Sequence, residues 1–213
     1  MNIDEKIAAL RSFEIFHTLT NEDLVDLAEY TQDKTFPKGT ILIKEGEKEN
    51  EMYFIISGLV RIYHLHESGK EMTISMRMPI EVVGEMSLID EEPRSATVEA
   101  LQETQVLLLS KEHFLLILEK HPRIGLHFLK LLSTRLREAL RVQKSIVFES
   151  LEERTYHILQ ILSPHFPADG IELSHDELST LINATQPRVT EVLNGLEKEN
   201  KITLSRKKIL VHK

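Results

Sequence analysis

The residues best suited to bind a charged ligand lie in two nearby dipeptides, Gly84-Glu85 and Arg94-Ser95. A glycine followed by free backbone N–H groups can cradle a phosphate, and the planar guanidinium of Arg94 can neutralise it through paired hydrogen bonds. The Ser95 hydroxyl can donate to a second phosphate oxygen, and the Glu85 carboxylate can accept from a ribose hydroxyl. The alternative is an ordinary surface turn in which Glu85 and Arg94 form an exposed ion pair.

A second group of polar residues lies near the C-terminal end, on two short predicted helices. Ser174 and Glu177 form a capping box that opens a helix running to about Ile182, and Thr185 is expected to cap another helix. The connection of about three residues is typical of a helix-turn-helix. Asn183 supplies a residue that tolerates a positive φ where glycine is usual in such a turn.

If this pair of helices binds DNA, the second helix enters the major groove with its exposed polar side chains on base edges. These candidate contacts are Thr185, Gln186, Arg188, Thr190, Glu191 and Asn194. Residues 201–212 then alternate as two short strands and predict a hairpin wing, in which Arg206 and Lys207 can meet phosphate. The alternatives are an ordinary three-helix bundle and a winged-helix module that binds protein.

The composition narrows the chemistry further. The chain contains no cysteine, which excludes disulfides, cysteine-ligated iron–sulfur or zinc sites and a thiol nucleophile. His64 and His66 face the same side of a predicted strand, where solvent-exposed hairpin histidines are favoured over a haem or metal site. The sequence has no nucleophile motif, metal-spaced cluster or P-loop. We therefore expect a protein that is not an enzyme and requires no cofactor.

The net charge of −8 is unevenly distributed along the chain. Residues 150–213 contain 8 Lys and Arg against 9 Asp and Glu, so nearly all of the negative charge belongs to the residues before them. This balance permits nucleic-acid binding by the C-terminal part without indicating it. The polar N-terminus is unlike a signal peptide, and no run approaches the roughly 18 apolar residues of a membrane span. We expect a cytoplasmic protein with no membrane partner.

The secondary structure predicted to position these residues changes from strands to helices along the chain. Residues 36–109 form short alternating or apolar runs separated by glycine-containing turns, which predicts an antiparallel roll or barrel. Strong helix formers then predict a short helix over 111–120 and a long one over 122–147. A capping box that begins at Ser150 opens a further helix, so residues 148–149 are a candidate hinge.

The long predicted helix carries an apolar seam whose members recur at intervals of three and four, the pattern by which two helices pair. They are Leu129, Leu132, Leu136, Ala139, Gln143 and Ile146. The alternative is a helix laid on the core of its own domain, but the charged flanks favour self-pairing. We expect a homodimer formed through residues 122–147.

The sequence resembles the Crp–Fnr family of bacterial transcription factors over nearly its whole length. GTILIKEGEKENEMYFIISGLVRIY looks like the first half of the family's sensor roll, and VVGEMSLIDEEPRSATV resembles its phosphate-binding cassette. The resemblance implies a cyclic-nucleotide-type pocket in which Met86 and Ser87 supply backbone contacts. Its full set of residues would be Gly84, Glu85, Met86, Ser87, Arg94, Ser95 and Arg135, the last from the long helix.

The resemblance also implies the fold class, α+β, and a division into three parts. Residues 1–121 would form the sensor β-roll of cyclic-nucleotide-binding type with flanking short helices. Residues 122–149 would form the dimerisation helix and hinge, and residues 150–213 a winged helix-turn-helix that binds DNA.

The sequence departs from the family pattern at two sites. Where members that respond to cyclic AMP carry a Thr-Ser pair that reads the adenine, this chain has Ala139 and Leu140, which offer no side-chain hydrogen bond. In the recognition helix, Gln186, Pro187 and Glu191 replace an arginine, a glutamate and an arginine of the family. We therefore expect a poorly read base and a different operator.

These observations predict a ligand-responsive regulator that binds a pseudo-palindromic operator in double-stranded DNA as a homodimer, with RNA polymerase as a further partner. A cyclic nucleotide would be the small-molecule effector. Two alternatives stay open. One is a cyclic-nucleotide-sensing module that regulates a partner protein, and the other is a regulator whose roll binds another small molecule or no ligand.

Overall fold

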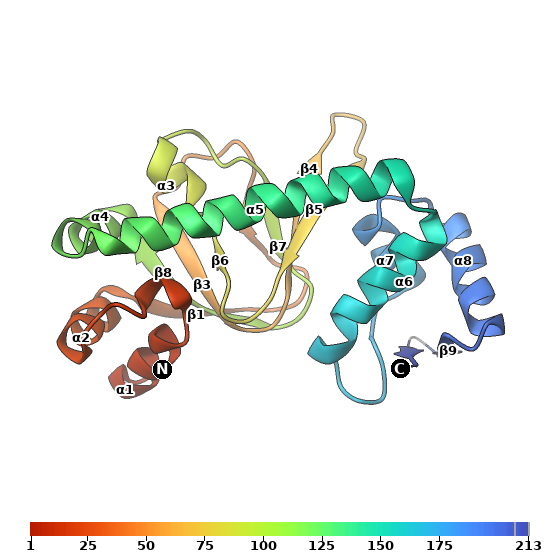
Figure 1. Cartoon of the computed structure of the whole chain (residues 1–213), viewed down its shortest axis with the longest axis horizontal. Helices are drawn as coiled ribbons and strands as arrows, with labels where there is room; N and C mark the ends of the chain where they lie inside the picture. Colours follow the sequence, from red (N-terminus) through yellow and green to blue (C-terminus); the bar gives the residue numbers. More distant parts are fainter. Residues whose placement is uncertain (207, 213) are drawn as a thin grey trace. The chain divides into compact units, whose positions relative to one another are not determined.

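A computed structural model describes residues 1–206 and 208–212 of the chain. The chain forms two compact units. The first comprises Met1–Tyr63 and Met76–Arg137, and the second comprises His64–Ser75 and Glu138–Lys213. The first unit combines most of the strands with several helices, and the second is mainly helical (Figure 1), so the predicted α+β class is confirmed.

Two four-stranded sheets build the roll, in the orders β1-β8-β3-β6 and β2-β7-β4-β5. All pairs in the first sheet are antiparallel, as the turn-separated runs predict. The short or charged strands β1, β6 and β7 carry too little apolar alternation to be expected from the sequence. The strands are β1 (Gln32–Phe36), β2 (Ile41–Ile43), β3 (Glu51–Ser57), β4 (Val60–Leu65), β5 (Glu71–Arg77), β6 (Val82–Val83), β7 (Thr97–Ala100) and β8 (Thr104–Ser110).

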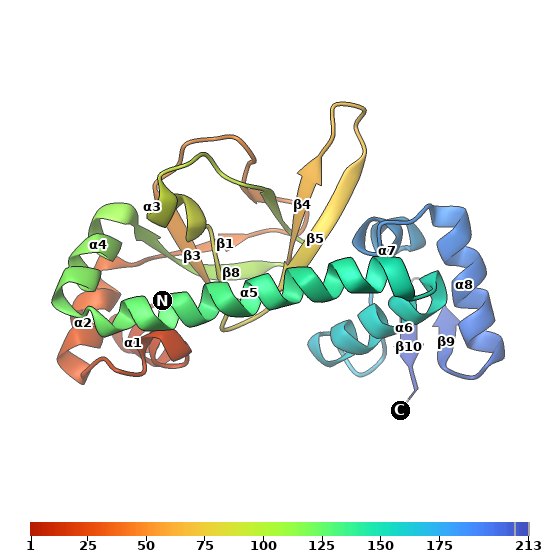
Figure 2. The ribbon, with the colours of Figure 1, turned by 45° about the horizontal axis from the view of Figure 1, so that its top comes forward.

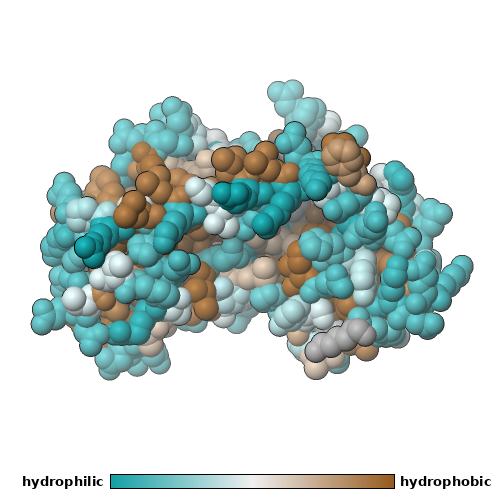
Figure 3. All heavy atoms as spheres, viewed as in Figure 1, coloured by the Kyte–Doolittle hydropathy of each residue, from teal (hydrophilic) through white to brown (hydrophobic). Residues whose placement is uncertain are grey.

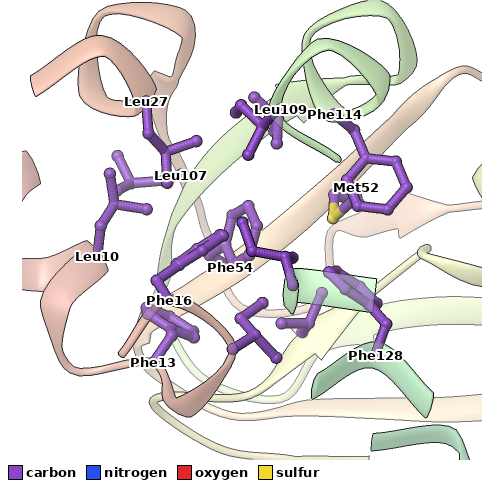
Figure 4. Close-up of a cluster of buried hydrophobic side chains, with 14 of the residues drawn as sticks. Leu10, Phe13, Phe16, Leu27, Met52, Phe54, Leu107, Leu109, Phe114 and Phe128 are labelled. Carbon is purple, nitrogen blue, oxygen red and sulfur yellow. The ribbon is translucent and has the colours of Figure 1, made fainter. Parts of the chain in front are cut away.

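Strand β3 is buried on both faces because its alternate side chains enter two different cores. Tyr53 and Ile55 face the interior of the roll, where they pack with Val83 and Val98. Met52 and Phe54 face the other way, into a cluster with the N-terminal helices and the start of the long helix. Figure 4 shows this second cluster, in which the Phe54 ring lies edge-on to Phe13 at 5.2 Å between centroids.

The helices α1, α2 and α4 pack on the face of the first sheet that carries Met52 and Phe54, and α4 is followed by the long helix α5. Thr20 caps α2 through a capping box with Asp23, and the predicted short helix over 111–120 is confirmed. The elements are α1 (Ile3–Arg11), η1 (Glu14–Phe16), α2 (Asn21–Tyr30), α3 (Met86–Asp90), α4 (Lys111–Lys120) and α5 (Arg123–Phe148).

Helix α5 buries only its first turns and exposes most of the predicted seam. Ile124 and Phe128 enter the core, whereas Leu129 is 61% exposed and Leu136 is 64% exposed. Hydrophobic side chains gather along its course in Figure 3, and Ile146 is exposed as well. A helix laid wholly on its own core would not show this pattern. Among the described residues, no helix is both long and apolar enough to cross a membrane.

The second unit is a three-helix bundle with a hairpin, and both predicted capping boxes, at Ser150 and Ser174, are present. Helix α8 packs against α6, α7 and the first hairpin strand (Figure 2). Thr185 precedes α8 as expected, but its side chain makes no capping hydrogen bond among the described residues, which corrects its assigned role as a cap. The elements are α6 (Leu151–Leu162), η2 (Ser163–His165), α7 (His175–Leu181), α8 (Gln186–Lys198), β9 (Ile202–Ser205) and β10 (Lys208–Val211).

Candidate ligand-binding site

Two strands bring the halves of the predicted cassette together. Strand β6 ends immediately before Gly84, and β7 begins soon after Arg94. The backbone of Arg94 is fixed beside the turn that follows β2, the strand paired with β7, since its N–H donates to the Glu47 carbonyl and its carbonyl accepts from the Gly46 N–H, each at 2.9 Å. The position of the Arg94 side chain is therefore set by main-chain pairing.

Arg94 is 3% exposed, and its guanidinium donates three hydrogen bonds. Nη1 donates to the Gly84 carbonyl at 2.7 Å and to the Ser87 hydroxyl at 2.8 Å. Nη2 donates to the Glu51 carbonyl at 2.5 Å and lies 3.6 Å from a Glu49 carboxylate oxygen. The Ser87 side chain therefore helps to hold Arg94, and the backbone contact to a ligand that the family resemblance implies for Ser87 stays a prediction.

Only glycine fits at position 84, both because of its backbone conformation and because there is no room for a side chain. Its φ is +82°, in the region that favours glycine. A Cβ there would lie 2.8 Å from Nη1 of Arg94 and 2.9 Å from the Ile43 side chain. The glycine lets the chain turn from β6 into α3 directly against the arginine.

Glu85 pairs with Arg135 rather than with Arg94. Its side chain is 1% exposed and accepts a hydrogen bond from Nη1 of Arg135, whose Nη2 donates to the Val82 carbonyl. Arg135 lies on α5, so the long helix contributes to this cluster as the family resemblance implies. The alternative of an exposed Glu85–Arg94 ion pair on a surface turn is wrong, because both side chains are buried and have other charge partners.

Buried side-chain atoms of Arg94, Glu85, Arg135 and Glu49 make no hydrogen bond within the described part of the chain. Two of them differ in character: Nε of Arg94 is a cationic donor, and Oε2 of Glu85 is an anionic acceptor. A buried charged atom without a hydrogen bond is costly, so each is suited to a group of opposite character from a ligand. A phosphate oxygen suits the first and a hydroxyl suits the second.

The remaining predicted pocket residues are less enclosed. Ser95 and Met86 are exposed, and their side chains make a weak contact of 3.9 Å from hydroxyl to sulfur. Ala139 and Leu140 are exposed on the part of α5 that belongs to the second unit, and their role in reading a base stays a prediction.

On the recognition helix, the predicted contacts divide by exposure. Gln186, Arg188, Glu191 and Asn194 are exposed on α8, which also buries Val189 and Leu193 on its opposite face. Thr190 is half-buried, and its hydroxyl lies 2.9 Å from Nδ1 of His175 on α7. Thr190 therefore joins the two helices of the motif, a role that the spacing of polar residues does not reveal.

The wing is a hairpin, as predicted, with β9 paired antiparallel to β10. Arg206 is exposed in its turn. Lys207, the other predicted phosphate contact, lies outside the described residues. Lys208 is held by Asp169 at 2.5 Å and Glu172 at 2.9 Å, and these hydrogen bonds raise the pKa of its ammonium group.

The turn of the motif has a further contact within the second unit. Asn183 has a φ of 54°, as its place in the turn predicts. Its side chain accepts a hydrogen bond from the Thr73 N–H and donates one to the Thr73 carbonyl, both at 2.8 Å. One asparagine therefore satisfies both backbone groups of a residue 110 positions away in the chain.

Of the two histidines predicted to share a strand, His64 lies in β4 and His66 lies just beyond its end. His66 bonds through Nδ1 to the Ser68 hydroxyl at 2.9 Å in the hairpin turn, and His64 is half-buried. Among the described residues, no group of three or more His, Cys, Asp or Glu side chains is arranged to hold a metal ion.

Comparisons with known proteins agree with this geometry. Residues 33–121 match the family profile of the cyclic nucleotide-binding domain. Over 92% of its length, the chain is 32% identical to the cyclic AMP receptor protein of Thermus thermophilus and spans 90% of that protein. The chain belongs to the Crp–Fnr family. Members of this family are transcriptional regulators rather than enzymes.

Solved structures of Crp–Fnr regulators share the fold. The catabolite activator protein of Thermus thermophilus is 32% identical, with 93% of each chain covered and a TM-score of 0.54. A c-di-GMP-responsive global regulator from Xanthomonas campestris is 20% identical, with a TM-score of 0.77 over 91% of this chain and all of that one. At that identity, the second likeness concerns the fold alone.

Proposed function

We propose that this Crp–Fnr regulator senses a small phosphate-bearing molecule in the cluster around Arg94 and Glu85, and reads DNA with α8. The observation that carries the sensor part is the pair of buried atoms, Arg94 Nε and Glu85 Oε2, which lack hydrogen bonds among the described residues. A donor and an acceptor in one buried cluster match the phosphate and the ribose hydroxyl of a cyclic nucleotide. The similarity to a protein named for its cyclic AMP receptor activity supports the same ligand class.

The dimer interface is the second element of the proposal. We assign it to the exposed apolar side chains of α5, including Leu129, Leu136 and Ile146, with the hinge between Phe148 and Ser150. Regulators of this family bind DNA as dimers, and an exposed seam of this kind is the surface by which two long helices pair. The predicted boundaries at residues 121 and 149 remain part of this proposal.

Ligand and DNA would be linked through α5. Arg135 on that helix holds Glu85, so a ligand that engages Glu85 changes the groups that hold α5 to the roll. Such a link shifts the population of helix arrangements only if the ligand binds one of them more tightly. RNA polymerase would be the partner of the DNA-bound form in the cytoplasm.

A thermal-shift panel of cyclic mono- and dinucleotides tests the sensor assignment. Saturation at about 100 times the Kd stabilises a protein by about 2.7 kcal/mol, a shift of several degrees in Tm. Arg94→Leu should abolish this shift, whereas Arg11→Leu, which removes an exposed arginine bonded to Asn21, should retain it. Because Arg94 also satisfies buried carbonyls, the informative quantity is the ligand-induced change and not the ligand-free Tm. A shift that survives in Arg94→Leu would refute the pocket.

Selection from fragmented genomic DNA tests the other half. The wild-type chain should enrich pseudo-palindromic sites, with half-sites about one helical turn apart. Salt-sensitive background alone would favour the other interpretation, a sensor that regulates a partner protein.

A further inference from the structure

Negative charge surrounds the outer nitrogen of Arg94. The Glu49 carboxylate lies 3.6 Å from Nη2, and the Glu51 carbonyl accepts from the same nitrogen. The Glu51 carboxylate in turn accepts from the Tyr53 hydroxyl at 3.3 Å. Burial, followed by the charges of Glu51 and Glu49, raises the pKa of Tyr53 well above its usual value, which agrees with a negative field at this place.

Glu49 faces Arg94 without a directional bond. The 3.6 Å separation exceeds hydrogen-bond range, and the closer carboxylate oxygen is buried with no hydrogen bond among the described residues. The Glu49 side chain as a whole is 40% exposed. The carboxylate thus neutralises the arginine by charge and is only weakly held, so it can move towards solvent at small cost.

The other nearby acids are engaged elsewhere. Glu85 pairs with Arg135, and Glu47, from the same turn as Glu49, pairs with Lys44 at 3.4 Å on the surface. Among the acids that the structure describes around the cassette, Glu49 is therefore the side chain placed to compete with an incoming anion for Arg94.

We infer that Glu49 is a built-in competitor that sets the affinity of the site for phosphate-bearing ligands. In the ligand-free protein its carboxylate balances the charge of Arg94. A phosphate makes shorter, charge-assisted hydrogen bonds to the guanidinium and displaces it, and the cost of that displacement weakens binding. This inference rests on the proposed function, since it concerns the same site.

Glu49→Gln removes the charge and keeps the shape of the side chain. We expect it to bind cyclic AMP, cyclic GMP or cyclic di-GMP, whichever the wild type binds, about tenfold more tightly by isothermal titration, as expected for loss of one close charge in a partly buried site. Glu47→Gln is the matched control, with the same chemical change in the same turn, and its affinity should stay within about twofold of the wild type. Added salt should narrow the gap between Glu49→Gln and the wild type, because it screens the charge that was removed.

Each outcome of the titration either supports or overturns the inference about Glu49. Tighter binding by Glu49→Gln, or binding by Glu49→Gln alone, supports the inference. Equal affinity in Glu49→Gln and the wild type overturns it and leaves the proposed ligand class intact. Equal tightening in Glu47→Gln also overturns it, since net charge would then be the cause. If no version binds any of the three nucleotides, both the proposed function and the inference fail. Glu49→Ala serves as the test variant if the glutamine variant does not fold.

Discussion

In the candidate ligand cassette, Arg94 and Glu85 are almost fully buried, Arg94 with several hydrogen-bond partners and Glu85 with Arg135. By contrast, Arg188 and Glu191 on α8 are exposed on a helix whose opposite, apolar face packs into the second unit. These polar side chains of the cassette are buried and bond to other parts of the chain, so they contribute to the stability of the fold. These polar side chains of α8 are exposed, so they contribute little to stability. Substitutions in the first region should therefore change stability and ligand binding together, and those in the second should change DNA binding alone.

The largest effect should come from adding a methyl group to the cassette. Gly84→Ala places a Cβ at 2.8 Å from Arg94 Nη1 at a φ of +82°, so we expect a loss of about 3 kcal/mol in unfolding free energy by urea denaturation. Gly39→Ala is the control. Its φ of +81° is equivalent, but a Cβ there has nothing within 4 Å, so we expect a loss of about 1 kcal/mol. Equal losses would show that the cassette is not tightly packed.

On the exposed face, Arg188→Ala should weaken operator binding by 10- to 100-fold, which is about 1–3 kcal/mol, and change stability by less than about 0.5 kcal/mol. Fluorescence anisotropy with a selected operator measures the first effect and thermal unfolding the second. Lys198→Ala, at the last residue of α8, is the control and should bind DNA nearly as well as the wild type. Equal affinities for Arg188→Ala and Lys198→Ala would place the contact surface elsewhere.

A third variant separates backbone conformation from hydrogen bonding in the turn of the motif. Asn183→Gly keeps the positive φ but removes both bonds to Thr73, so unfolding should cost about 1 kcal/mol less than in the wild type. Asn200→Gly, at a similar φ of 57°, should be close to neutral in the same measurement. A neutral Asn183→Gly would mean that the two bonds contribute nothing.

Lowering the pH should have the smallest effect on stability, and it should destabilise both units. Hydrogen bonds from Thr20 lower the pKa of Asp23 in the first unit, and those from Ser150 lower the pKa of Glu153 in the second. The folded state binds these protons less readily than the unfolded state. The stabilisation is thus present above the ordinary values of 3.8 and 4.5 and is lost as the pH falls through the lowered values. We expect a level Tm between about pH 7 and 5.5 and a decline of a few degrees by about pH 3.5, measured by circular dichroism. If the Tm already declines at a pH above about 5, titratable groups other than Asp23 and Glu153 must cause the decline.

Local signals explain what the sequence predicts well. Capping boxes locate α2, α6 and α7, and alternation locates β3 and β8, because each depends on residues a few positions apart. The cassette is predicted from the resemblance to the family, because a glycine, an acid and an arginine at this spacing also fit an exposed ion pair on a surface turn. Helix α3 is not predicted, since five residues carry too little periodicity to be recognised.

Long-range pairing explains what the sequence does not reveal. Glu49 lies near Arg94 because two main-chain hydrogen bonds join the turn before Glu49 to Arg94, although these segments are more than 40 residues apart in the chain. Thr190 contacts His175 because α7 and α8 pack against each other. Neither contact leaves a periodic pattern in the sequence. The polar set on α8 can be predicted as a surface, but its base contacts depend on DNA, which the protein's own packing does not determine.

The lysines near the wing bear on how this regulator would find its sites. Lys208 is held by Asp169 and Glu172, and Lys201 by Glu152 and Glu199, at 2.5 to 3.2 Å. Cations already neutralised by the protein release few counterions from DNA, so affinity should change only gently with ionic strength. A weak attraction to DNA of random sequence would leave the molecule mostly free between encounters with DNA. It would search the chromosome by repeated three-dimensional collisions more than by travelling along the duplex.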